Sequence, residues 1–600
     1  MARLQWLAIL GLLVSASAIA QPAPIAERIA STVLSGRTPT ALPWNEDTGL
    51  LLAGMDAAWY NSANGDDFRF VSQAVDAYLA GRNTGSDGVP STPADALMAR
   101  QLLFLYRVTL KPEYFRAASM ERERELGVCG GPENHDATGT QKYPASICLA
   151  QPFLAEYANV FDSAGDFAAV TASFANTERL IEASFDTAHA APQEAQNASL
   201  TLAVLVDSLP YYPPDDPGRV RLLEILRRTT DSIRKHQDTR TGLFYLAEQK
   251  SAAKNTTALA SSNGLLIYTI LKAVRLGYLP TQDAASAERA WRGVRQRIVH
   301  VDTTGTPHNA GSSSSSTNAE LYGEGALLLA ATEADLAPAA TLARGKTVLM
   351  DAWYNSQQRK NAAGQMESFH YKWNDYADSG YSSVGDLFRS FGAETDTLYA
   401  APTIENLKDA SVYIIVSPDI PIKNPNPHYV NNQEAAAVAE WVKQGGVLVL
   451  MENDPPNADL DHLNLLADRF GIHFDNVLHH HILGDHVEDG AMPITPGGPL
   501  FHQQHTIYMK DTCAISLKAP AAALFRDRGD VVMAAAKYGR GMVFATVDPW
   551  LYNEYTDGRK NPKIYSQFGN FAAGHELVHW LLLQIPGEGI KEKERQESRP

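Results

Sequence analysis

The chain has 600 residues and a formal net charge of −17 at pH 7. This length is too great for one hydrophobic core, because domains usually hold about 100 to 200 residues, so we expect two or three domains. The negative charge argues against a nucleic-acid partner, which is bound by clustered Lys and Arg, but it permits a local basic pocket for an acidic sugar. The cysteines are too few for a disulfide scaffold: Cys129, Cys148 and Cys513.

Residues 1–20 have the features of a secretory signal peptide. Arg3 supplies a positive start, residues 4–14 are mostly apolar, and residues 18–20 form a small-residue cleavage site. The apolar run is too short to cross a bilayer, and no other uninterrupted apolar stretch reaches about 20 residues. We therefore expect an exported protein, periplasmic or extracellular, with no membrane partner. In an oxidising compartment, a bridge between Cys129 and Cys148 is one option.

Residues 47–351 are patterned almost wholly as helices separated by Gly, Pro and Asp turns. One predicted helix opens at Pro217 and repeats apolar side chains at helical spacing as far as Ile233. Another runs from Gly264 to a Gly C-cap at Gly277. About 300 residues of helical hairpins must either close on themselves or stack as a solenoid. Since no solenoid repeat is evident, a closed α/α toroid is favoured.

The pattern changes after a polar stretch at residues 355–365, which we interpret as a linker. Buried strands at residues 412–416 and 447–451 alternate with helices at 434–443 and 460–470, which predicts a parallel sheet covered on both faces. A hairpin and a last helix follow, at residues 531–546 and 571–583. The predicted divisions are a signal peptide at 1–20, a helical domain at 21–350, a linker at 351–366, an α/β domain at 367–585 and a disordered tail at 586–600.

Five segments of the helical half occur in a fixed order. They are RQLLFLYRVT at residues 100–109, AQPFLAEY at 150–157, VDSLPYYP at 206–213, KAVRLGYL at 272–279 and GALLLAATE at 325–333. In this order they resemble glycoside hydrolase family 105, the unsaturated rhamnogalacturonyl hydrolases, and the related family 88. The resemblance implies a six-hairpin (α/α)6 toroid whose central cavity binds a sugar with a 4,5-unsaturated uronic acid. It also implies that an aspartic acid protonates the enol ether, after which water adds and the product rearranges.

The residues that perform this chemistry in the family are largely replaced. Counting back from the AQPF motif places Ala145 where the family has its aspartic acid, and Tyr143 where it has a Trp. An alanine cannot donate a proton. The Arg and Trp residues that the family carries just before Val206 are also absent, since residues 193–200 read QEAQNASL. Glu133 and Glu194 are candidate replacement acids.

Other residues in the expected cavity region keep a chemical role open. Asp95 lies near the position of the family's second carboxylate, although an acid at a helix start also interacts with the helix dipole. His135 and Asp136 occupy a segment where the family often has a His, and a surface loop is the alternative interpretation. In the same segment, Gln141 and Tyr143 are candidates for substrate binding.

The second half resembles the class I glutamine-amidotransferase-like domain that follows the hydrolase domain in some family members. The segments that carry this resemblance are FRSFGA at residues 388–393, YIIVSPD at 413–419, WVKQGGVLVLM at 441–451 and DPWLYNEY at 548–555. The resemblance implies a flavodoxin-like α/β fold. A working amidotransferase needs a Cys nucleophile backed by a His. Here Glu452, Asn453 and Asp454 follow the strand instead, so we do not expect glutaminase activity.

Two further groups of residues in the second half are possible sites. The run His479 to His481, followed by Asp485 and His486, lacks regular ligand spacing, so neither a metal nor another cofactor is predicted. Acidic and aromatic residues at strand ends form the second group and could line a carbohydrate pocket at the carboxyl edge of the sheet, with a structural turn as the alternative. They are Asp548, Trp550, Asn553 and Glu554, with Glu452, Asp454 and His462.

Two hypotheses for function follow. The first is an exported carbohydrate-active protein of the unsaturated-uronyl glycoside hydrolase type, which acts on or binds pectin-derived oligosaccharides and uses a relocated acid. The second is a non-catalytic pseudo-hydrolase that binds carbohydrate or docks onto a partner enzyme through its C-terminal domain. Both predict an acidic oligosaccharide or polysaccharide as the ligand.

Overall fold

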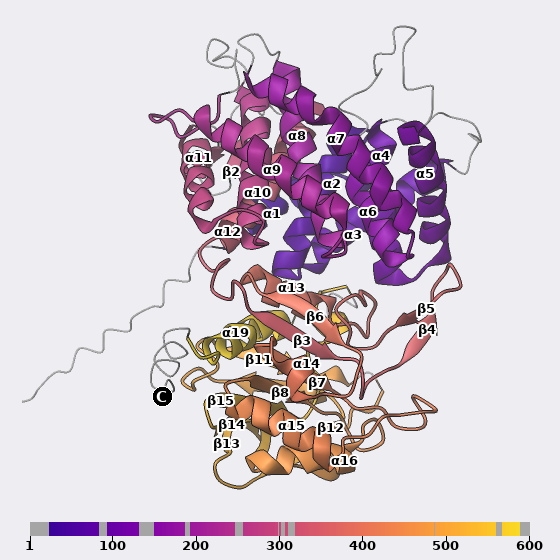
Figure 1. The fold of residues 1–600 in the computed structure, drawn as a ribbon, viewed down its shortest axis with the longest axis vertical. Coiled ribbons are helices and arrows are strands. Elements are labelled where there is room, and N and C mark those ends of the chain that lie inside the picture. Colours follow the sequence, from indigo (N-terminus) through magenta and orange to yellow (C-terminus); the bar gives the residue numbers. More distant parts are fainter. Residues whose placement is uncertain are drawn as a thin grey trace, which may run out of the picture.

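The computed structural model contains a helical domain and a domain built around a β-sheet, stacked along the long axis of the molecule (Figure 1). No helix in the described part of the chain is long and apolar enough to cross a membrane. The expected signal peptide lies outside the described residues. These are 23–82, 93–130, 149–186, 192–245, 256–297, 299–301, 307–309, 318–484, 486–559 and 567–587.

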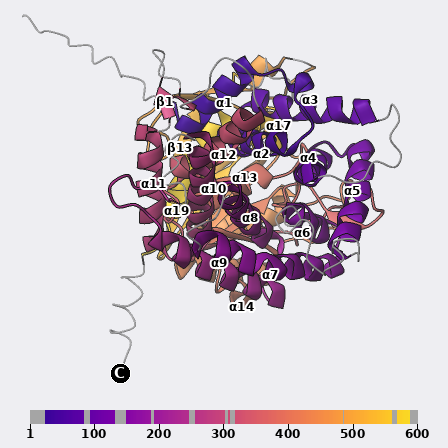
Figure 2. The same ribbon diagram turned by 90° about the horizontal axis from the view of Figure 1, so that it is seen from above.

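The helical domain is a double ring (Figure 2). In the part of the chain that the structure describes, each inner helix contacts the next, and the last contacts the first, so the ring is closed. The predicted toroid is therefore confirmed. The inner helices are α2 (Glu46–Ser62), α4 (Pro93–Thr109), α6 (Gln151–Val160), α8 (Pro192–Ser208), α10 (Thr256–Arg275) and α12 (Asn318–Leu336). The outer helices are α1 (Ile25–Gly36), α3 (Gly65–Arg82), α5 (Pro112–Gly130), α7 (Ala164–Asp186), α9 (Pro217–Lys235) and α11 (Ala284–Arg297).

The inner helices all run in the same direction, because one outer helix separates each from the next along the chain. Side-chain contacts agree with this: Gly49 near the start of α2 lies against Leu97 near the start of α4. Further along both helices, the rings of Trp59 and Phe104 are 5.5 Å apart. The amino ends of the inner helices therefore lie at one end of the ring, and their carboxyl ends lie at the other.

Glycine allows three of the inner helices to pack closely. A Cβ atom at Gly325 of α12 would lie 2.7 Å from the carbonyl of Leu50 in α2. A Cβ atom at Gly264 of α10 would lie 2.8 Å from the carbonyl oxygen of Ala326. Any larger residue would push these backbones apart. Helix α10 begins at Thr256, eight residues before the predicted start at Gly264, because Gly264 serves packing inside the helix rather than its start.

The second domain contains a seven-stranded sheet in the described residues, in the order β13-β14-β15-β8-β7-β3-β6. Strands β15, β8, β7, β3 and β6 are parallel, and β13 and β14 are antiparallel additions at one edge. The predicted strands at 412–416 and 447–451 and the predicted hairpin are confirmed. The strands are β3 (Thr347–Asp351), β6 (Glu394–Leu398), β7 (Val412–Val416), β8 (Val447–Met451), β13 (Ala522–Asp527), β14 (Asp530–Tyr538) and β15 (Gly541–Thr546).

The predicted linker at residues 351–366 is wrong. Strand β3 ends at Asp351 and lies inside the sheet, between β7 and β6, so the second domain begins before the expected boundary. The polar stretch that followed it forms a small antiparallel hairpin of β4 (Gln358–Lys360) and β5 (Met366–Ser368). The prediction failed for two reasons. Strand β3 has only five residues and follows a long helix closely, so its periodicity is weak. The hairpin after it is polar, which is the composition expected of a linker.

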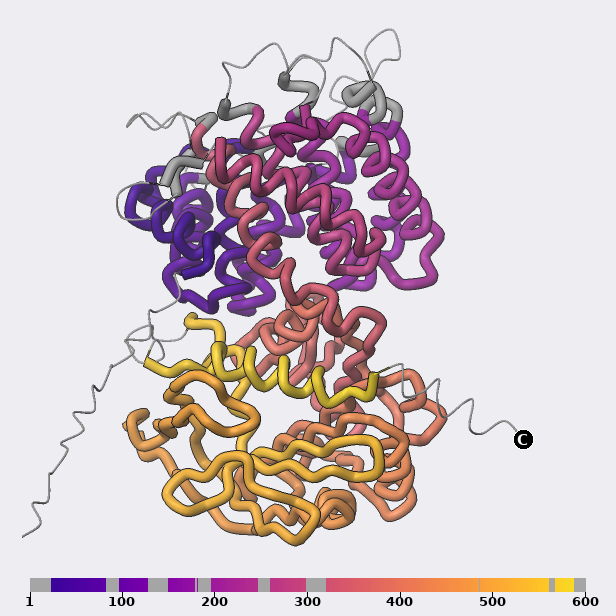
Figure 3. The backbone as a smooth tube through the Cα atoms, turned by 90° about the vertical axis from the view of Figure 1, so that its left-hand side faces the viewer, coloured from indigo at the N-terminus to yellow at the C-terminus, as the bar shows by residue number. Residues whose placement is uncertain are grey.

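Helices cover the sheet on both faces. The layer that contains α13 (Ser382–Ser390) and α19 (Asn570–Leu583) lies between the sheet and the helical ring (Figure 3). A second layer holds α14 (Ile404–Leu407), α15 (Asn432–Lys443) and α16 (Leu460–Ala467), which contact each other in succession. Every residue of β7 and β8 is buried, as two-sided cover requires.

Candidate functional site

The structure does not describe the side chains of the residues predicted in the cavity region of the helical domain. Asp95 lies in the first turn of α4, but its side chain is outside the described set. The same holds for Glu194 in α8 and for Cys129 in α5. The remaining predicted residues of this region fall outside the described residues altogether: Glu133, His135, Asp136, Gln141, Tyr143, Ala145 and Cys148.

The axis of the ring, towards the carboxyl ends of the inner helices, holds a network of buried charges centred on Asp207 of α8. One carboxylate oxygen accepts a hydrogen bond from Arg100 of α4 at 2.6 Å. The other accepts from Tyr268 of α10 at 2.6 Å and from Lys272 of α10. Burial alone would raise the pKa of Asp207, but Lys272 and Arg100 hold it well below its usual range. Asp207 is therefore ionised, and its contacts link α4, α8 and α10.

Two more ion pairs extend this network around the axis. Arg107 of α4 donates to Glu156 of α6 at 2.5 Å, with little of either side chain exposed. Arg275 of α10 forms a two-point pair with Glu333 of α12. Bidentate Arg–carboxylate geometry suits such buried pairs, because it offsets the cost of removing both charges from water. Glu156 and Glu333 are therefore each paired with an arginine.

The α/β domain closes this end of the ring. Tyr376 lies under the guanidinium of Arg107, with 3.7 Å between the guanidinium carbon and the ring centroid. The indole N–H of Trp59 in α2 donates to the carbonyl of Asp557. On the other side, the side chain of Gln365 donates to the carbonyl of Phe161, which follows α6. The carboxyl end of the ring thus contacts the second domain on both sides.

Asp56 of α2 differs from the other carboxylates of the axis. It is only 9 % exposed, yet its Oδ1 atom has no hydrogen-bond partner. Burial raises its pKa to about 7; Glu156 and Asp386 add to this shift, whereas Arg100 and Lys272 oppose it. These charges come from three other inner helices, α4, α6 and α10, and from α13. A carboxyl group with this pKa is partly protonated at neutral pH.

We did not single out Asp56 from the sequence, although a signal exists. It is the one charged residue in the otherwise apolar stretch from Leu50 to Trp59. An acid inside an apolar helical run must be buried, paired or functional. The sequence alone could not distinguish these options, because the pairing depends on helices distant in the chain.

The carboxyl edge of the sheet contains a second polar centre, and half of it is fully hydrogen-bonded. Asp351 at the end of β3 accepts from the backbone N–H groups of Tyr354 and Asn355 and from the hydroxyl of Tyr413. Asp419, just after β7, accepts from Ser356 and from the side chains of Gln357 and Asn424. The ammonium of Lys372 lies between these acids and donates to Asn355 at 3.1 Å. This half of the edge stabilises the loops after the strands.

The other half of the edge has buried polar atoms without partners. Glu452 follows β8 and is completely buried, and neither of its carboxyl oxygens has a hydrogen-bond partner. Burial raises the pKa of Glu452 well above its usual range, and Asp459 adds to the shift. Asp548, after β15, also has an unpartnered oxygen, and burial raises its pKa in the same way. Burial therefore favours the protonated form of both carboxyl groups. Ser417, Thr546 and Trp550 add further unpartnered atoms at these strand ends.

The predicted carbohydrate residues occupy this edge, but several are inaccessible. Trp550 is completely buried, so its indole presents no face to a ligand. Asn553 has structural partners, since its amide donates to the carbonyl of Asp375 and accepts from the N–H of Ser383. Glu554 is partly exposed.

Two remaining residues of the predicted group lie beside the strand ends. Asp454 is buried and accepts from the side chain of Asn457 at 2.6 Å. His462 lies in the first turn of α16, where its ring pairs with Asp459 at 2.8 Å and stacks on Tyr429. Glu452 directly follows β8, Asp548 follows β15 after one intervening residue, Asp454 lies two residues beyond Glu452, and His462 lies on the helix that comes after it.

The histidine run presents its rings to three different acids. His479 pairs with Asp530, His480 with Asp527 and His481 with Asp511. In the described part of the chain, no group of three His, Cys, Asp or Glu side chains has the arrangement of a metal site. Asp485 lies outside the described residues.

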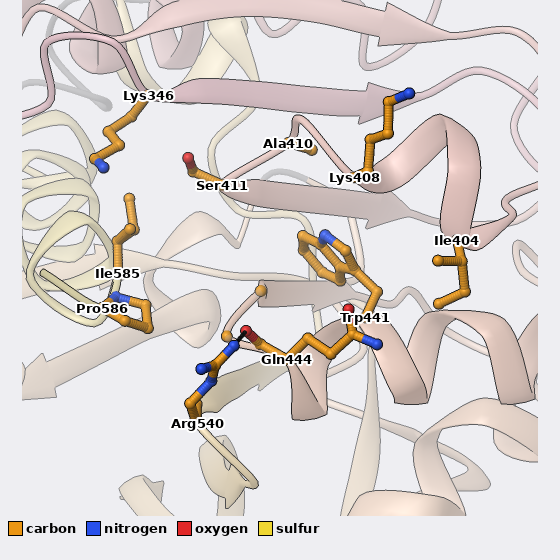
Figure 4. A pocket seen from close by; sticks show the side chains of 12 residues that line it. Lys346, Ile404, Lys408, Ala410, Ser411, Trp441, Gln444, Arg540, Ile585 and Pro586 are labelled. Atoms are coloured by element: carbon orange, nitrogen blue, oxygen red, sulfur yellow. Dashed lines mark hydrogen bonds between the residues drawn. The ribbon is translucent and has the colours of Figure 1, made fainter. Parts of the chain in front are cut away.

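A pocket of about 240 Å³ lies at the opposite, amino edge of the sheet (Figure 4). Its lining includes three basic side chains, Lys346, Lys408 and Arg540, around Trp441. Arg540 donates to the carbonyl of Gln444 at the carboxyl end of α15, and Lys408 pairs with an exposed Glu. Cations at helix carboxyl ends neutralise the helix dipole. Because open α/β sheets bind ligands at their carboxyl edge, this pocket is the weaker candidate.

Comparison with known proteins relates the helical domain to a family of carbohydrate-active enzymes. Residues 198–336, from α8 to the end of α12, match the model of Glycosyl Hydrolase Family 88. The match confirms the resemblance to families 88 and 105 for this part of the ring.

Solved structures with similar chains include two glycoside hydrolases. One is a family 105 glycoside hydrolase from C. acetobutylicum, with 18 % identity, coverage of 51 % of this chain and 98 % of that chain, and a TM-score of 0.42. Another is a family 88 glycosyl hydrolase from Bacteroides vulgatus, with 14 % identity, coverage of 52 % and 97 %, and a TM-score of 0.40.

Proposed function

We propose that this protein is an exported carbohydrate-active protein of the unsaturated-uronyl glycoside hydrolase type, which acts on or binds acidic, pectin-derived oligosaccharides. The observation that carries the proposal is the closed ring of parallel inner helices, in which residues 198–336 match the Glycosyl Hydrolase Family 88 model. Rings of this kind bind ligands along their axis, and here the α/β domain covers the carboxyl end. Substrate enters from the amino end.

The direction of the inner helices supports an acidic ligand. Their amino ends carry partial positive charge and all lie at the entrance. In a chain of net charge −17, this local field attracts a uronic acid that the rest of the surface repels. The field does not depend on the Arg and Trp residues that the family has before Val206 and that this chain lacks.

The alternative is a non-catalytic pseudo-hydrolase that binds carbohydrate or docks onto a partner enzyme. The replacement of the expected aspartic acid by Ala145 favours it. For the second domain we propose a flavodoxin-like, glutamine-amidotransferase-like fold without glutaminase activity. The order of its parallel strands supports this: numbered along the chain from β3, they lie in the order 2-1-3-4-5.

The decisive experiment offers the purified protein an unsaturated disaccharide made by a polysaccharide lyase. Loss of the absorbance of the 4,5 double bond at catalytic rates supports the enzyme and excludes the pseudo-hydrolase. Binding measured by calorimetry without turnover supports the pseudo-hydrolase. The proposal would be refuted if the protein neither bound nor turned over pectin-derived or other unsaturated uronyl sugars. A saturated disaccharide of the same composition is the control for recognition of the double bond.

A further inference from the structure

The pocket at the amino edge of the sheet has a positive lining in an acidic protein (Figure 4). Three of its side chains are cationic, Lys346, Lys408 and Arg540, and none of the other described lining residues is acidic. The whole chain carries a formal net charge of −17. Like charges that share a pocket repel each other unless a counter-ion is bound, so this lining favours an anion inside it.

Two lysines of the pocket are available to such an anion. Lys346 lies just before β3, its side chain is partly buried, and it forms no ion pair with any residue that the structure describes. Lys408 has a partner, Glu405, but the two side chains are 54 % and 82 % exposed. A pair so exposed to water contributes little to stability. An anion in the pocket can therefore attract both ammonium groups.

The third cation, Arg540, is held in place by the turn between β14 and β15. Glycine lets this turn pack tightly on the end of α15: a Cβ atom at Gly539, where φ is 59°, would lie 2.5 Å from the carbonyl oxygen of Lys443. One guanidinium nitrogen donates to the carbonyl of Gln444 at 2.7 Å. Neutralisation of the helix dipole explains Arg540, but it does not explain Lys346, which comes from a different element.

The indole of Trp441 supplies a neutral donor in the same pocket. Trp441 is 5 % exposed, and a Cβ atom at Gly446 would lie 2.4 Å from a ring carbon, so the backbone covers part of the indole. The indole N–H donates to no described residue, and in Figure 4 its nitrogen lies on the side of the ring nearest Lys408. A nearly buried N–H without a partner favours a ligand that accepts a hydrogen bond.

The size of the pocket and the apolar part of its lining narrow the class of ligand. The volume of about 240 Å³ is below the range of about 300 to 1,000 Å³ that is usual for drug-sized ligands, so the ligand is small. A mineral anion has no apolar surface, whereas the C–H groups of a sugar ring can cover apolar side chains. Those that line the pocket are Ile404, Ala410, Ile585 and Pro586.

We propose that this pocket binds a small sugar acid, a uronate, at a site separate from the ring. Its carboxylate accepts from Lys346, Lys408 and the indole N–H of Trp441, and its C–H groups contact the apolar side chains. Sheets of this kind place their reactive sites at the carboxyl edge, so a site at the amino edge holds the sugar without converting it. The choice of a uronate over other small carboxylates rests on the proposed function, whereas the anion site itself does not.

The test measures how a ligand protects individual lysines of the full chain from acetylation, with mass spectrometry as the readout. Galacturonate should slow the labelling of Lys346 and Lys408, and galactose, which lacks the carboxylate, should not. Added salt should weaken the protection, because it screens the charges. Lys443 lies on α15 outside the pocket lining, its side chain is 61 % exposed, and its labelling should stay the same throughout.

Two variants test which groups bind the carboxylate. Lys346→Gln removes a hydrogen bond from a charged donor, so the galacturonate concentration that half-protects Lys408 should rise about tenfold. Trp441→Phe keeps an aromatic ring without the N–H and should raise that concentration about twofold to tenfold. Lys443→Gln is the matched control and should leave it unchanged. Because Lys346 is partly exposed and unpaired, Lys346→Gln should fold as the unchanged protein does.

The outcomes separate this inference from the proposed function. No protection by galacturonate, or protection by sulfate at a lower concentration than by galacturonate, overturns the sugar-acid site. Equal shifts in Lys346→Gln and Lys443→Gln also overturn it, because the general charge of the surface would then attract the ligand. Binding or turnover of the unsaturated disaccharide that persists in Lys346→Gln belongs to the ring and supports the proposed function. Protection of the pocket lysines without such binding or turnover supports the pocket and refutes the role of the ring.

Discussion

The axis of the ring and the carboxyl edge of the sheet are both buried and polar, but they handle charge in opposite ways. In the ring, most buried carboxylates are paired with Arg or Lys, as with Asp207 and Glu333. At the β8 and β15 end of the sheet, Glu452 and Asp548 have unpartnered oxygens, and burial raises the pKa of each. The paired charges link neighbouring helices, whereas burial favours the protonated form of the unpaired acids. Asp56 combines both settings, because it is an unpaired acid inside a paired network.

The largest expected effect tests the paired network. Asp207→Ala leaves Arg100 and Lys272 without their shared carboxylate, and unpairing a buried charge costs about 3 to 5 kcal/mol. We expect the free energy of unfolding of the helical domain to fall by that amount in chemical denaturation followed by circular dichroism. A loss below about 1 kcal/mol would show that the network is fully hydrated and that the comparison with the sheet edge is mistaken.

The second prediction concerns the paired half of the sheet edge and its response to acid. Burial lowers the pKa of His370 from 6.5 to about 3, so the folded protein keeps this ring neutral. The unfolded chain takes up the proton first, so this part of the stability is present above pH 6.5 and is lost as the pH falls towards 3. Between pH 7 and pH 5, His370 should cost up to about 2 kcal/mol.

The change His370→Asn isolates this contribution. Asn tolerates the left-handed backbone at this position, where φ is 64°. In thermal unfolding at pH 7 and pH 5, the variant should lose less stability on acidification than the unchanged protein. His486→Asn, at a histidine side chain that is 70 % exposed, is the control and should leave the acid dependence as it was. Equal acid dependence in all three proteins would contradict the burial argument.

A matched pair of isosteric changes compares the two centres directly. Burial favours the protonated form of Glu452, which Gln resembles, so Glu452→Gln should not lower stability at pH 7. Glu333→Gln removes the carboxylate that pairs with the buried Arg275 and should lower the free energy of unfolding. Because burial raises the pKa of Glu452, the unchanged protein loses stability as the pH rises above about 4.5, and the Glu452→Gln variant should be spared that loss. Equal losses of stability in the two variants would contradict the distinction between unpaired and paired acids.

The sequence predicted the architecture better than the site, for a physical reason. Apolar periodicity and turn residues are local, and they identified the toroid, strands β7 and β8 and the hairpin. Strand β3 was missed because its five residues follow a helix closely and take their identity only from pairing with β6 and β7. The family segments predicted the ring, since they encode helix packing such as the contact of Gly325 with α2.

The chemical state of the acids could not be predicted from the sequence. Glu452 and Asp548 were placed at the correct edge because both follow buried strands. That they are unpartnered, and that Trp550 is inaccessible, depends on loops from elsewhere in the chain. Likewise, Asp56 and Asp207 look alike in sequence, as single acids in apolar helices. Only the positions of Arg100 and Lys272 make Asp207 an ion-pair partner and leave Asp56 without one.

The smallest expected effect sets the baseline for the whole comparison. Glu405 pairs with Lys408 on the surface, where its side chain is 82 % exposed. Water already solvates both charges, so pairing adds little favourable free energy and costs side-chain entropy. Glu405→Ala should change the free energy of unfolding by less than about 0.5 kcal/mol, and added salt should reduce even that difference. If this variant lost as much stability as Asp207→Ala, burial would not be what separates the strong ion pairs from the weak ones.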